Sequence, residues 1–295
     1  MIIECVPNFS EGRRPGVVDQ IAAVVRAAPG VSLLDLQADK DHNRSVLTFV
    51  GTPSGLKIAA VAAVKKAMEL IDLTKHQGTH PRMGACDVLP FVPIRDASLG
   101  DCVQMAREVG QSVGNLGIPV FLYEAAATRP ERKNLADIRN HHQFEGLRER
   151  IGSDPAFDPD SGPKKIHPTA GATAVGARMP LIAYNIDLET EDLAIAKAIA
   201  KKIREKGGGL PGIKALGMHI AERKCAQVSM NVCDYTRTSL QKVYREVERL
   251  AGESKVKIRS SEVVGMLPAA ALSEDWIREL KLEAFTAGQI IENRI

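Results

Sequence analysis

The sequence predicts a layered α/β (α+β) protein made of two α/β sandwich subdomains, each with helices on one face of a mixed sheet. Hydrophobic residues make up 44% of the 295 residues but aromatic residues only 4%, so the core consists mainly of aliphatic side chains, which favours helices packed on sheets. The chain is long enough for two ordinary domains. Apolar runs typical of strands alternate with amphipathic helical patterns in the same order in both halves.

The first half has patterns in the order strand, helix, strand, strand, helix, strand. These elements are expected at Met1–Val6, Val17–Ala28, Val31–Leu36, Ser45–Val50, Ser54–Leu73 and Asp87–Pro93. A helix over Leu99–Leu116 and a strand over Ile118–Tyr123 follow. The stretch Arg129–Gly146, which contains the pair His141–His142, is expected to form helix and surface loop, and the two histidines are interpreted as structural.

A Pro-, Asp- and Gly-rich segment, Ser153–Lys165, breaks the periodicity and predicts a domain linker. Beyond it the order is again strand, helix, strand, strand, helix, strand. The elements are expected at Met179–Ile186, Glu191–Lys206, Ile213–Ile220, Ala226–Val232, Thr238–Leu250 and Val256–Val264. This is the split βαβ order of ferredoxin-like domains. We therefore expect two ferredoxin-like α/β sandwich subdomains, 1–178 and 179–295, with a ligand cleft between them.

Charge and cysteine content exclude several classes of protein. The formal net charge of +3 is small and the basic residues are scattered, so neither nucleic-acid nor membrane binding is predicted. The chain starts without a positively charged leader, and no segment approaches the roughly 18 apolar residues of a membrane span, so we expect a cytoplasmic protein. The five cysteines lack CxxC or zinc-finger spacing, which favours reduced thiols in the core.

Chemically active side chains gather in the loop segment Thr74–Ile94, TKHQGTHPRMGACDVLPFVPI. His76 and His80 are four residues apart, a spacing that suits zinc when both lie on a helix. Gly78 and Pro81 disfavour a regular helix there, because proline restricts the residue before it to extended geometry. The sequence therefore predicts no metal site in this loop.

Several residues have two open interpretations. His80 is either a structural loop histidine or a general acid/base, because imidazole titrates near neutral pH. Arg82 either holds a carboxylate with two hydrogen bonds or forms a surface salt bridge. Asn43 and Arg44 belong either to a plain polar hairpin or to the wall of the ligand cleft.

The run of small residues Gly171–Arg178, GATAVGAR, superficially suggests a phosphate loop. It lacks both the GK[ST] of a P-loop and the GxGxxG of a dinucleotide fold, so neither ATP nor NAD is expected as a cofactor. Its glycines and alanines allow the backbone to approach a flat ligand closely.

Five segments together resemble the glutamate formiminotransferases, the folate-dependent enzymes of histidine breakdown that are fused to a cyclodeaminase in some organisms. The segments are ECVPNFSEGR, HNRSVLTFVG, KHQGTHPRMGACDVLPFVPI, HPTAGATAVGARMPLIAYNIDL and QVSMNV. The resemblance covers nearly the whole chain, and HPRMGA is a specific signature. It implies transfer of a formimino group between N-formimino-L-glutamate and tetrahydrofolate, giving 5-formiminotetrahydrofolate and L-glutamate, without a metal.

The resemblance also implies site residues and partners. His80 matches the catalytic histidine of the family. The folate-binding stretch of the family matches Pro163, Lys164, Lys165, Ile166, His167, Pro168, Thr169, Ala170, Gly171 and Ala172. Tetrahydrofolate is then the co-substrate, a homodimer is expected, and a separate cyclodeaminase is a possible partner.

Both substrates carry glutamate carboxylates, so arginines are expected in the site. Arg44 and Arg82, with Asn43 beside them, are the candidates for the substrate glutamate, and Lys164 and Lys165 for the folate tail. Two alternatives stay open. One is a folate enzyme that acts on 5-formyltetrahydrofolate or transfers a formyl group to or from glutamate, and the other is a folate-binding module without catalysis.

One departure from the family concerns the folate stretch. Where some members have an aromatic residue after the proline, this chain has Thr169 and Ala170. A possible stacking surface for the pterin is therefore absent from that position.

Overall fold

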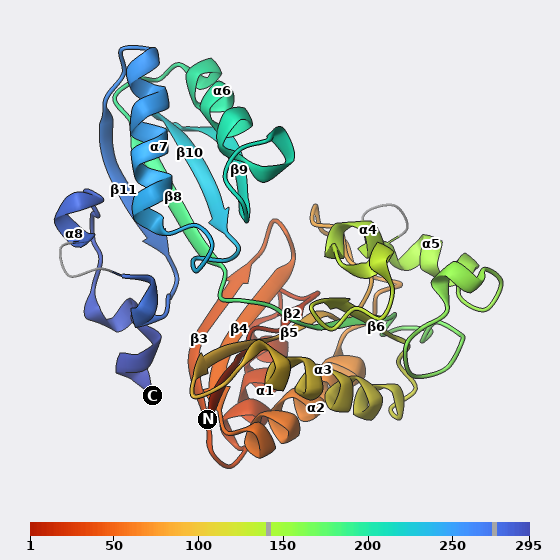
Figure 1. The fold of residues 1–295 in the computed structure, drawn as a ribbon. Helices are drawn as coiled ribbons and strands as arrows, with labels where there is room; N and C mark the ends of the chain where they lie inside the picture. Colours follow the sequence, from red (N-terminus) through yellow and green to blue (C-terminus); the bar gives the residue numbers. More distant parts are fainter. Residues whose placement is uncertain (140–142, 273–275) are drawn as a thin grey trace. The chain divides into compact units, whose positions relative to one another are not determined.

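The computed structural model describes residues 1–139, 143–272 and 276–295. The chain divides into two compact units, Met1–Arg178 and Met179–Ile295, and Figure 1 shows both coloured along the sequence. Each unit has its own sheet and its own hydrophobic cluster. The pair His141–His142, interpreted above as structural, lies outside the described residues.

The first unit combines a mixed sheet with long helices. Its strands are β1 (Ile2–Cys5), β2 (Asn8–Phe9), β3 (Val31–Asp39), β4 (Arg44–Gly51), β5 (Cys86–Arg95), β6 (Val120–Glu124) and β7 (Thr173–Ala177). Its helices are α1 (Pro15–Arg26), α2 (Pro53–Leu70), α3 (Leu99–Gly114), α4 (Leu135–Arg139) and α5 (Gln143–Arg150). β1 pairs antiparallel with β4 and β5, whereas β7 runs parallel to both β5 and β6.

Local sequence explains where the two central helices of this unit begin. The Thr52 side chain accepts a hydrogen bond from Gly55 N at the start of α2, and Pro53 occupies the first turn. Ser98 and Asp101 form a capping box at the start of α3. These caps satisfy backbone donors that have no partner inside the helix.

The second unit has the order β8 (Ile182–Leu188), α6 (Leu193–Ile203), β9 (Ile213–Ile220), β10 (Cys225–Val232), α7 (Leu240–Glu253) and β11 (Ile258–Val264), followed by the short helix α8 (Trp276–Glu279). Its strands lie in the order β11-β8-β10-β9. Every pairing among its described strands is antiparallel. Helix α6 contacts β9 and β10, and α7 contacts β8, with both helices on the same side of the sheet (Figure 1).

The predicted α/β fold class is confirmed, because each unit is a sheet covered by helices, and the expected elements agree with the structure to within a few residues. One detail is wrong: the second sheet is antiparallel rather than mixed. The ligand cleft stays a prediction.

The predicted linker, Ser153–Lys165, lies inside the first unit instead. Asp160 Oδ2 accepts a hydrogen bond from Leu122 N at 2.8 Å and pairs with Arg132 at 2.6 Å, while Val120 N donates to Ser161 O at 2.9 Å. Proline and glycine break helical and strand periodicity in ordered loops as well as in linkers. The composition of a segment therefore does not reveal what it packs against.

The small-residue run is also different from the expectation. Thr173–Ala177 forms β7, and all five of its residues are buried between β5 and β6. A Cβ atom at Gly176 would collide with the Tyr123 ring. In Thr173–Ala177 the small side chains therefore serve close packing of a central strand, and the approach of a flat ligand to the preceding residues stays a prediction.

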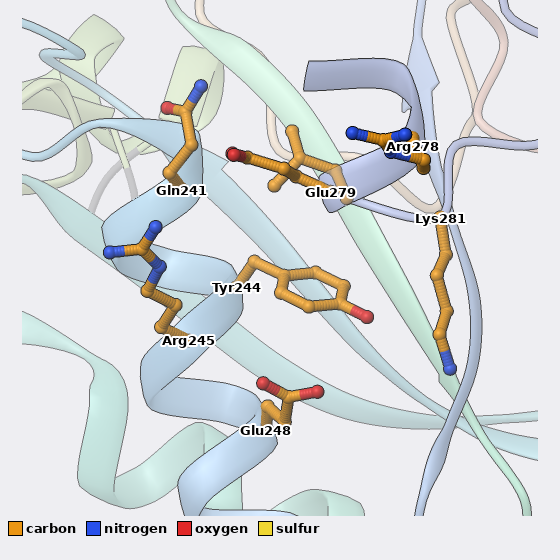
Figure 2. Close-up of a pocket in the computed structure, with 8 residues that line it drawn as sticks. Gln241, Tyr244, Arg245, Glu248, Arg278, Glu279 and Lys281 are labelled. Carbon is orange, nitrogen blue, oxygen red and sulfur yellow. The ribbon is translucent and has the colours of Figure 1, made fainter. Parts of the chain in front are cut away.

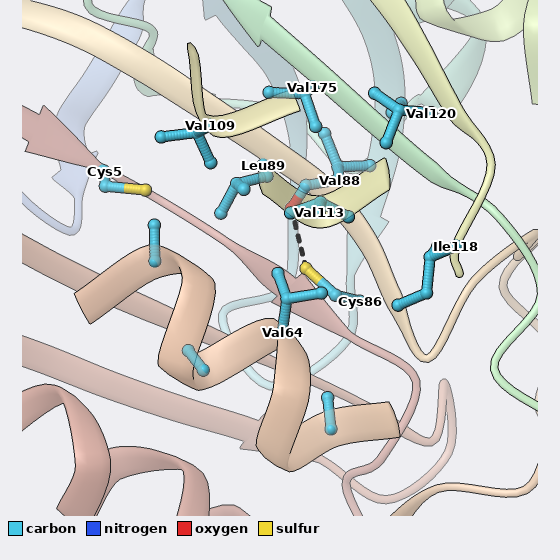
Figure 3. Packing of buried hydrophobic residues seen from close by; sticks show 14 of the residues in the cluster. Cys5, Val64, Cys86, Val88, Leu89, Val109, Val113, Ile118, Val120 and Val175 are labelled. Atoms are coloured by element: carbon cyan, nitrogen blue, oxygen red, sulfur yellow. Dashed lines mark hydrogen bonds between the residues drawn. The ribbon is translucent and has the colours of Figure 1, made fainter. Parts of the chain in front are cut away.

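The core of the first unit is aliphatic, as the composition predicts. Figure 3 shows Val64 of α2 with Leu89 and Val88 of β5 among the packed residues. Four cysteines are buried and Cys233 is partly exposed, and all five are free thiols. Burial raises the pKa of Cys102 to about 12, so this thiol stays protonated and unreactive.

Candidate active site

The loop between α2 and β5 forms turns and bends rather than a helix, which confirms the prediction from Gly78 and Pro81. A Cβ atom at Gly78 would collide with the backbone carbonyl oxygen of His42. Only glycine permits this approach, so the loop packs directly against the turn before β4. The two segments that carry His80 and Asn43 therefore lie against each other.

A buried aspartate is the centre of this region. Asp87 of β5 has no exposed surface, and its Oδ2 accepts hydrogen bonds from Arg44 Nη1 at 2.8 Å and Arg139 Nη1 at 2.9 Å. Its Oδ1 accepts a hydrogen bond from Met83 N at 2.7 Å. The two guanidinium groups lower the pKa of Asp87 against the opposing effect of burial, so the carboxylate is ionised. It ties the end of the loop to β4 and α4.

His80 is half-buried and lies beside this cluster. Its Nδ1 is 2.7 Å from the carbonyl oxygen of Pro81 and 3.2 Å from Arg44 Nη1. A carbonyl only accepts and a guanidinium only donates, so the shorter contact assigns the hydrogen to Nδ1. The other ring nitrogen, Nε2, then carries the lone pair.

The protonation state of His80 follows from its surroundings. Burial lowers the pKa of His80, and the positive charge of Arg44 lowers it further, whereas the Pro81 carbonyl and the Asp87 carboxylate raise it. The net direction is downward, so the imidazole is neutral at pH 7. A neutral imidazole with a free Nε2 is able to accept a proton.

Asn43 has a structural role in this arrangement. It adopts a left-handed backbone conformation with φ of 50°. Its Oδ1 accepts a hydrogen bond from Gly12 N at 2.9 Å, and its Nδ2 donates to Gln77 O at 2.9 Å. The Asn43 carbonyl oxygen is 2.9 Å from His76 Nε2. Asn43 thus joins three segments, and its predicted contact with substrate stays a prediction.

Arg82 is engaged by a carboxylate of the protein itself. Its Nη1 and Nη2 donate to the two oxygens of Glu145 at 2.8 and 2.7 Å, and its Nε donates to His76 Nδ1 at 3.3 Å. Arg82 therefore already makes the bidentate ion pair that was expected with a substrate carboxylate, and its partner is Glu145 of the same chain. A role of Arg82 in substrate binding would require exchange of Glu145, and it stays a prediction.

The folate stretch, 163–172, has an exposed half and a buried half. Pro163, Lys164 and Lys165 are exposed, and Lys164 Nζ is 2.7 Å from Asp158. The chain then turns back on itself, with hydrogen bonds between the backbones of His167 and Gly171 at 3.2 and 3.1 Å. Lysine side chains that project from the exposed half are accessible to an anionic ligand.

The buried half of this stretch pairs with the end of the His80 loop. Ala85 N donates to Ala170 O at 2.8 Å, and Ala172 N donates to Met83 O at 2.9 Å. A Cβ atom at Gly171, which has φ of 71°, would collide with the Met83 carbonyl. The structure thus brings the predicted folate segment against the backbone next to the predicted catalytic loop.

His167 has a defined tautomer within this turn. Its Nδ1 accepts hydrogen bonds from Ala170 N at 2.9 Å and Thr169 N at 3.4 Å. Two backbone donors on one nitrogen require it to be unprotonated, so the hydrogen lies on Nε2. Burial lowers the pKa of His167, which keeps this neutral form.

Two pockets differ in their relation to these residues. A pocket of about 490 Å³ in the first unit borders the loop and is lined by Glu11, Arg13, Arg14, Asn43, Leu70, Ile71, Asp72, Lys75 and His76. A pocket of about 250 Å³ in the second unit lies between α7 and the end of α8 with the two residues that follow it, and Tyr244 projects between them (Figure 2). None of the predicted site residues lines the second pocket.

Two residues of the site were missed from the sequence. Asp87 was interpreted as the acidic side chain of the loop segment and the start of a strand, without a role in the site, and Arg139 as part of a helix and surface loop. The signal for Asp87 was an acidic residue inside an otherwise apolar strand pattern, VLPFVPI after CD, which calls for buried partners. Arg139 gave no such signal, because its partner is 52 residues away.

Among the described residues, no group of three or more His, Cys, Asp or Glu side chains is arranged to hold a metal ion. In the same part of the chain, no helix has the length and apolar character of a membrane span.

Comparison with known proteins gives matches over the whole chain. The family model "Formiminotransferase domain, N-terminal subdomain" matches residues 2–178, and "Formiminotransferase domain" matches residues 183–283. Glutamate formimidoyltransferase of Streptococcus pyogenes serotype M1 is 48% identical over 100% of this chain and 98% of the relative, and that of Thermoplasma acidophilum is 43% identical over 100% and 97%. Formimidoyltransferase-cyclodeaminase of Rattus norvegicus is 42% identical over 92% of this chain and 51% of its own length. The chain therefore belongs to the formiminotransferase family.

Proposed function

We propose that this protein is a glutamate formimidoyltransferase that transfers the formimino group between N-formimino-L-glutamate and tetrahydrofolate, as a step of histidine degradation. The observation that carries the proposal is 48% identity, end to end, with a relative of that name. The neutral His80 with a free Nε2 supports it, because the reaction needs one group that accepts and then returns a proton.

The proposed reaction passes through a tetrahedral adduct. N5 of tetrahydrofolate attacks the formimino carbon, and His80 Nε2 takes the proton that N5 loses. The same nitrogen then gives that proton to the α-nitrogen of glutamate while the bond between this nitrogen and the formimino carbon breaks. L-Glutamate and 5-formiminotetrahydrofolate leave, and His80 returns to its neutral form.

The neighbours of His80 suit both halves of this cycle. The Pro81 carbonyl accepts the Nδ1 hydrogen in the neutral and the protonated ring, which fixes the orientation of Nε2. The positive charge of Arg44 disfavours the imidazolium, so the proton is readily returned. The neutral ring is therefore ready to accept a proton at the start of each turnover, and the protonated ring readily donates that proton later in the same turnover.

We assign the remaining site roles on the family resemblance and on accessibility. Lys164 and Lys165 are exposed and are proposed to hold the carboxylates of the folate tail, with the turn 166–172 beside the pterin. The proposed enzyme is a cytoplasmic homodimer, with N-formimino-L-glutamate and tetrahydrofolate as its small-molecule substrates. A separate cyclodeaminase is its proposed partner, because two relatives are named formimidoyltransferase-cyclodeaminase.

The direct test is an assay of the purified protein with N-formimino-L-glutamate and tetrahydrofolate, with 5-formiminotetrahydrofolate and L-glutamate as the measured products. A parallel assay with 5-formyltetrahydrofolate and L-glutamate measures formyl transfer. Product from the first pair supports the proposal. Product from the second pair alone would show that the protein transfers a formyl group instead of a formimino group. Without product from either pair, a folate-binding module without catalysis would be the remaining proposal.

A further inference from the structure

We propose that Arg139 is a specificity-determining residue of this site, whose guanidinium binds the α-carboxylate of the glutamate substrate. The inference rests on the proposed function, because it assigns a role in that reaction. Arg139 lies at the end of α4 and was not among the residues that the sequence singled out.

The cluster around Asp87 has an imbalance of charge. Arg44 and Arg139 both donate to the same oxygen of Asp87, and the side chains are 10%, 14% and 0% exposed respectively. His80 beside them is neutral. Among the described residues, one positive charge of this largely buried cluster is therefore not compensated, and such a charge is costly unless an anion pairs with it.

Arg139 also has hydrogen-bond donors that its described neighbours do not use. A guanidinium has five N–H donors, and in its contacts with the described residues Arg139 uses one of them, on Nη1, for Asp87. In the part of the chain that the structure describes, its buried Nε has no hydrogen-bond partner. Buried donors without partners are rare in proteins, so Arg139 has hydrogen-bonding capacity that its described neighbours do not use.

The other two arginines of the site are already engaged. Arg82 holds Glu145 with both terminal nitrogens. Arg44 donates from Nε to Asn8 at 3.1 Å and from Nη1 to Asp87, and it lies against His80. Arg44 keeps Nη2 outside these contacts, but among the described residues Arg139 differs from it in having a buried Nε without a partner as well.

The chemistry of the substrate explains why the ligand is a carboxylate. In N-formimino-L-glutamate the α-carboxylate is attached to the α-carbon, which also bears the nitrogen from which the formimino group leaves. His80 must reach that nitrogen to return the proton. A cation that shares Asp87 with Arg44, which itself touches His80, is therefore placed for the α-carboxylate rather than for the more distant γ-carboxylate.

The test compares substrates as well as variants. Formimino transfer to tetrahydrofolate is measured for the wild-type protein, Arg139→Gln and Arg139→Lys. Each protein is given three formimino donors in turn: N-formimino-L-glutamate, its α-carboxamide and its γ-carboxamide. Arg148→Gln, which changes an exposed arginine on the neighbouring helix α5, is the matched control. Thermal unfolding of each variant shows whether it is folded.

We expect kcat/KM of the wild-type protein to fall by about ten- to a hundredfold on the α-carboxamide, which is the usual contribution of a hydrogen bond to a charged group. For Arg139→Gln, kcat/KM on N-formimino-L-glutamate should fall by a similar factor, through a higher KM. This variant should use N-formimino-L-glutamate and its α-carboxamide almost equally well. Arg139→Lys should recover part of that discrimination. KM for tetrahydrofolate should not change.

Two results would overturn the inference. One is equal use of acid and α-amide by the wild-type protein, and the other is undiminished discrimination in Arg139→Gln. Stronger discrimination against the γ-carboxamide would also contradict it. If the wild-type protein has no transfer activity, the proposed function has failed, and titration calorimetry of L-glutamate against wild type and Arg139→Gln still tests the site: equal affinities would refute it.

Discussion

Two buried aspartates, one in each unit, hold arginines at the end of a strand, and their charge balance is opposite. Asp87 is shared by two arginines, Arg44 and Arg139. Asp187 of β8 pairs with one arginine, Arg223, at 2.9 Å, and that arginine also pairs with a second carboxylate. The first cluster has an excess of positive charge and the second an excess of negative charge.

The second cluster compensates its excess with amide donors. Gln227 Nε2 donates to Asp187 at 2.8 Å, and Asn185 Nδ2 donates to Glu262 at 3.0 Å. Hydrogen bonds from Arg223 lower the pKa of Glu262, which stays ionised. These hydrogen bonds and ion pairs link β8, β10 and β11, so the cluster braces a sheet. In the first cluster, Nε of Arg139 has no partner among the described residues, and this is why we propose that the first cluster binds a ligand.

The largest effect should come from removing the shared carboxylate. Asp87→Asn leaves two guanidinium groups without a counter-ion in a buried place, so we expect the free energy of unfolding to fall by about 3–5 kcal/mol. Asp187→Asn should lower it by only about 1–2 kcal/mol, because Arg223 retains Glu262. Urea unfolding at pH 7 measures both values, and an equal or larger loss for Asp187→Asn would refute the comparison.

Removal of the base beside the first cluster should be the next largest effect. His80→Ala is expected to lower kcat for formimino transfer on the order of a hundredfold or more, because no other group replaces the proton transfer. Folate binding, measured by fluorescence titration, should be unchanged. His219→Ala, a partly exposed histidine of β9, is the matched control. Full turnover of His80→Ala would end the acid/base assignment.

A smaller and more specific effect is expected from the charge of Arg44. Arg44→Gln removes a positive charge that lowers the pKa of His80, so that pKa should rise. The active form of the ring is neutral, and the ascending limb of kcat/KM against pH should therefore move to higher pH, with a greater loss at pH 6 than at pH 8. Arg139 continues to compensate Asp87 in this variant. An unchanged pH profile would exclude electrostatic control by Arg44.

The smallest effect should follow from breaking the exposed ion pair near the loop. The Glu145 side chain is 64% exposed, so Glu145→Gln should change the free energy of unfolding by less than about 1 kcal/mol. If Arg82 has no contact with substrate, KM for N-formimino-L-glutamate should also stay within about twofold. A marked fall in KM would instead show that Glu145 competes with the substrate for Arg82.

Much of the fold could be predicted from local patterns. The helical spacing of apolar residues identifies α2, and apolar runs identify β9 and β10. Both patterns depend on residues that are neighbours in the chain. Strand β7 was missed because its glycine and alanines carry no such pattern, and its parallel partners come from distant segments. Similarly, His80 was found through the motif around it, but Arg139 was not.

The sequence by itself determined the order of helices and strands, the non-helical loop around Gly78 and Pro81, and the residues that carry the family resemblance, because each depends on residues close together in the chain. Only the tertiary structure decided that Arg44, Asp87 and Arg139 meet beside His80 and that Glu145 occupies Arg82. The physical reason is that a buried charge is stabilised by its partners in space, and strand pairing brings those partners from segments tens of residues apart.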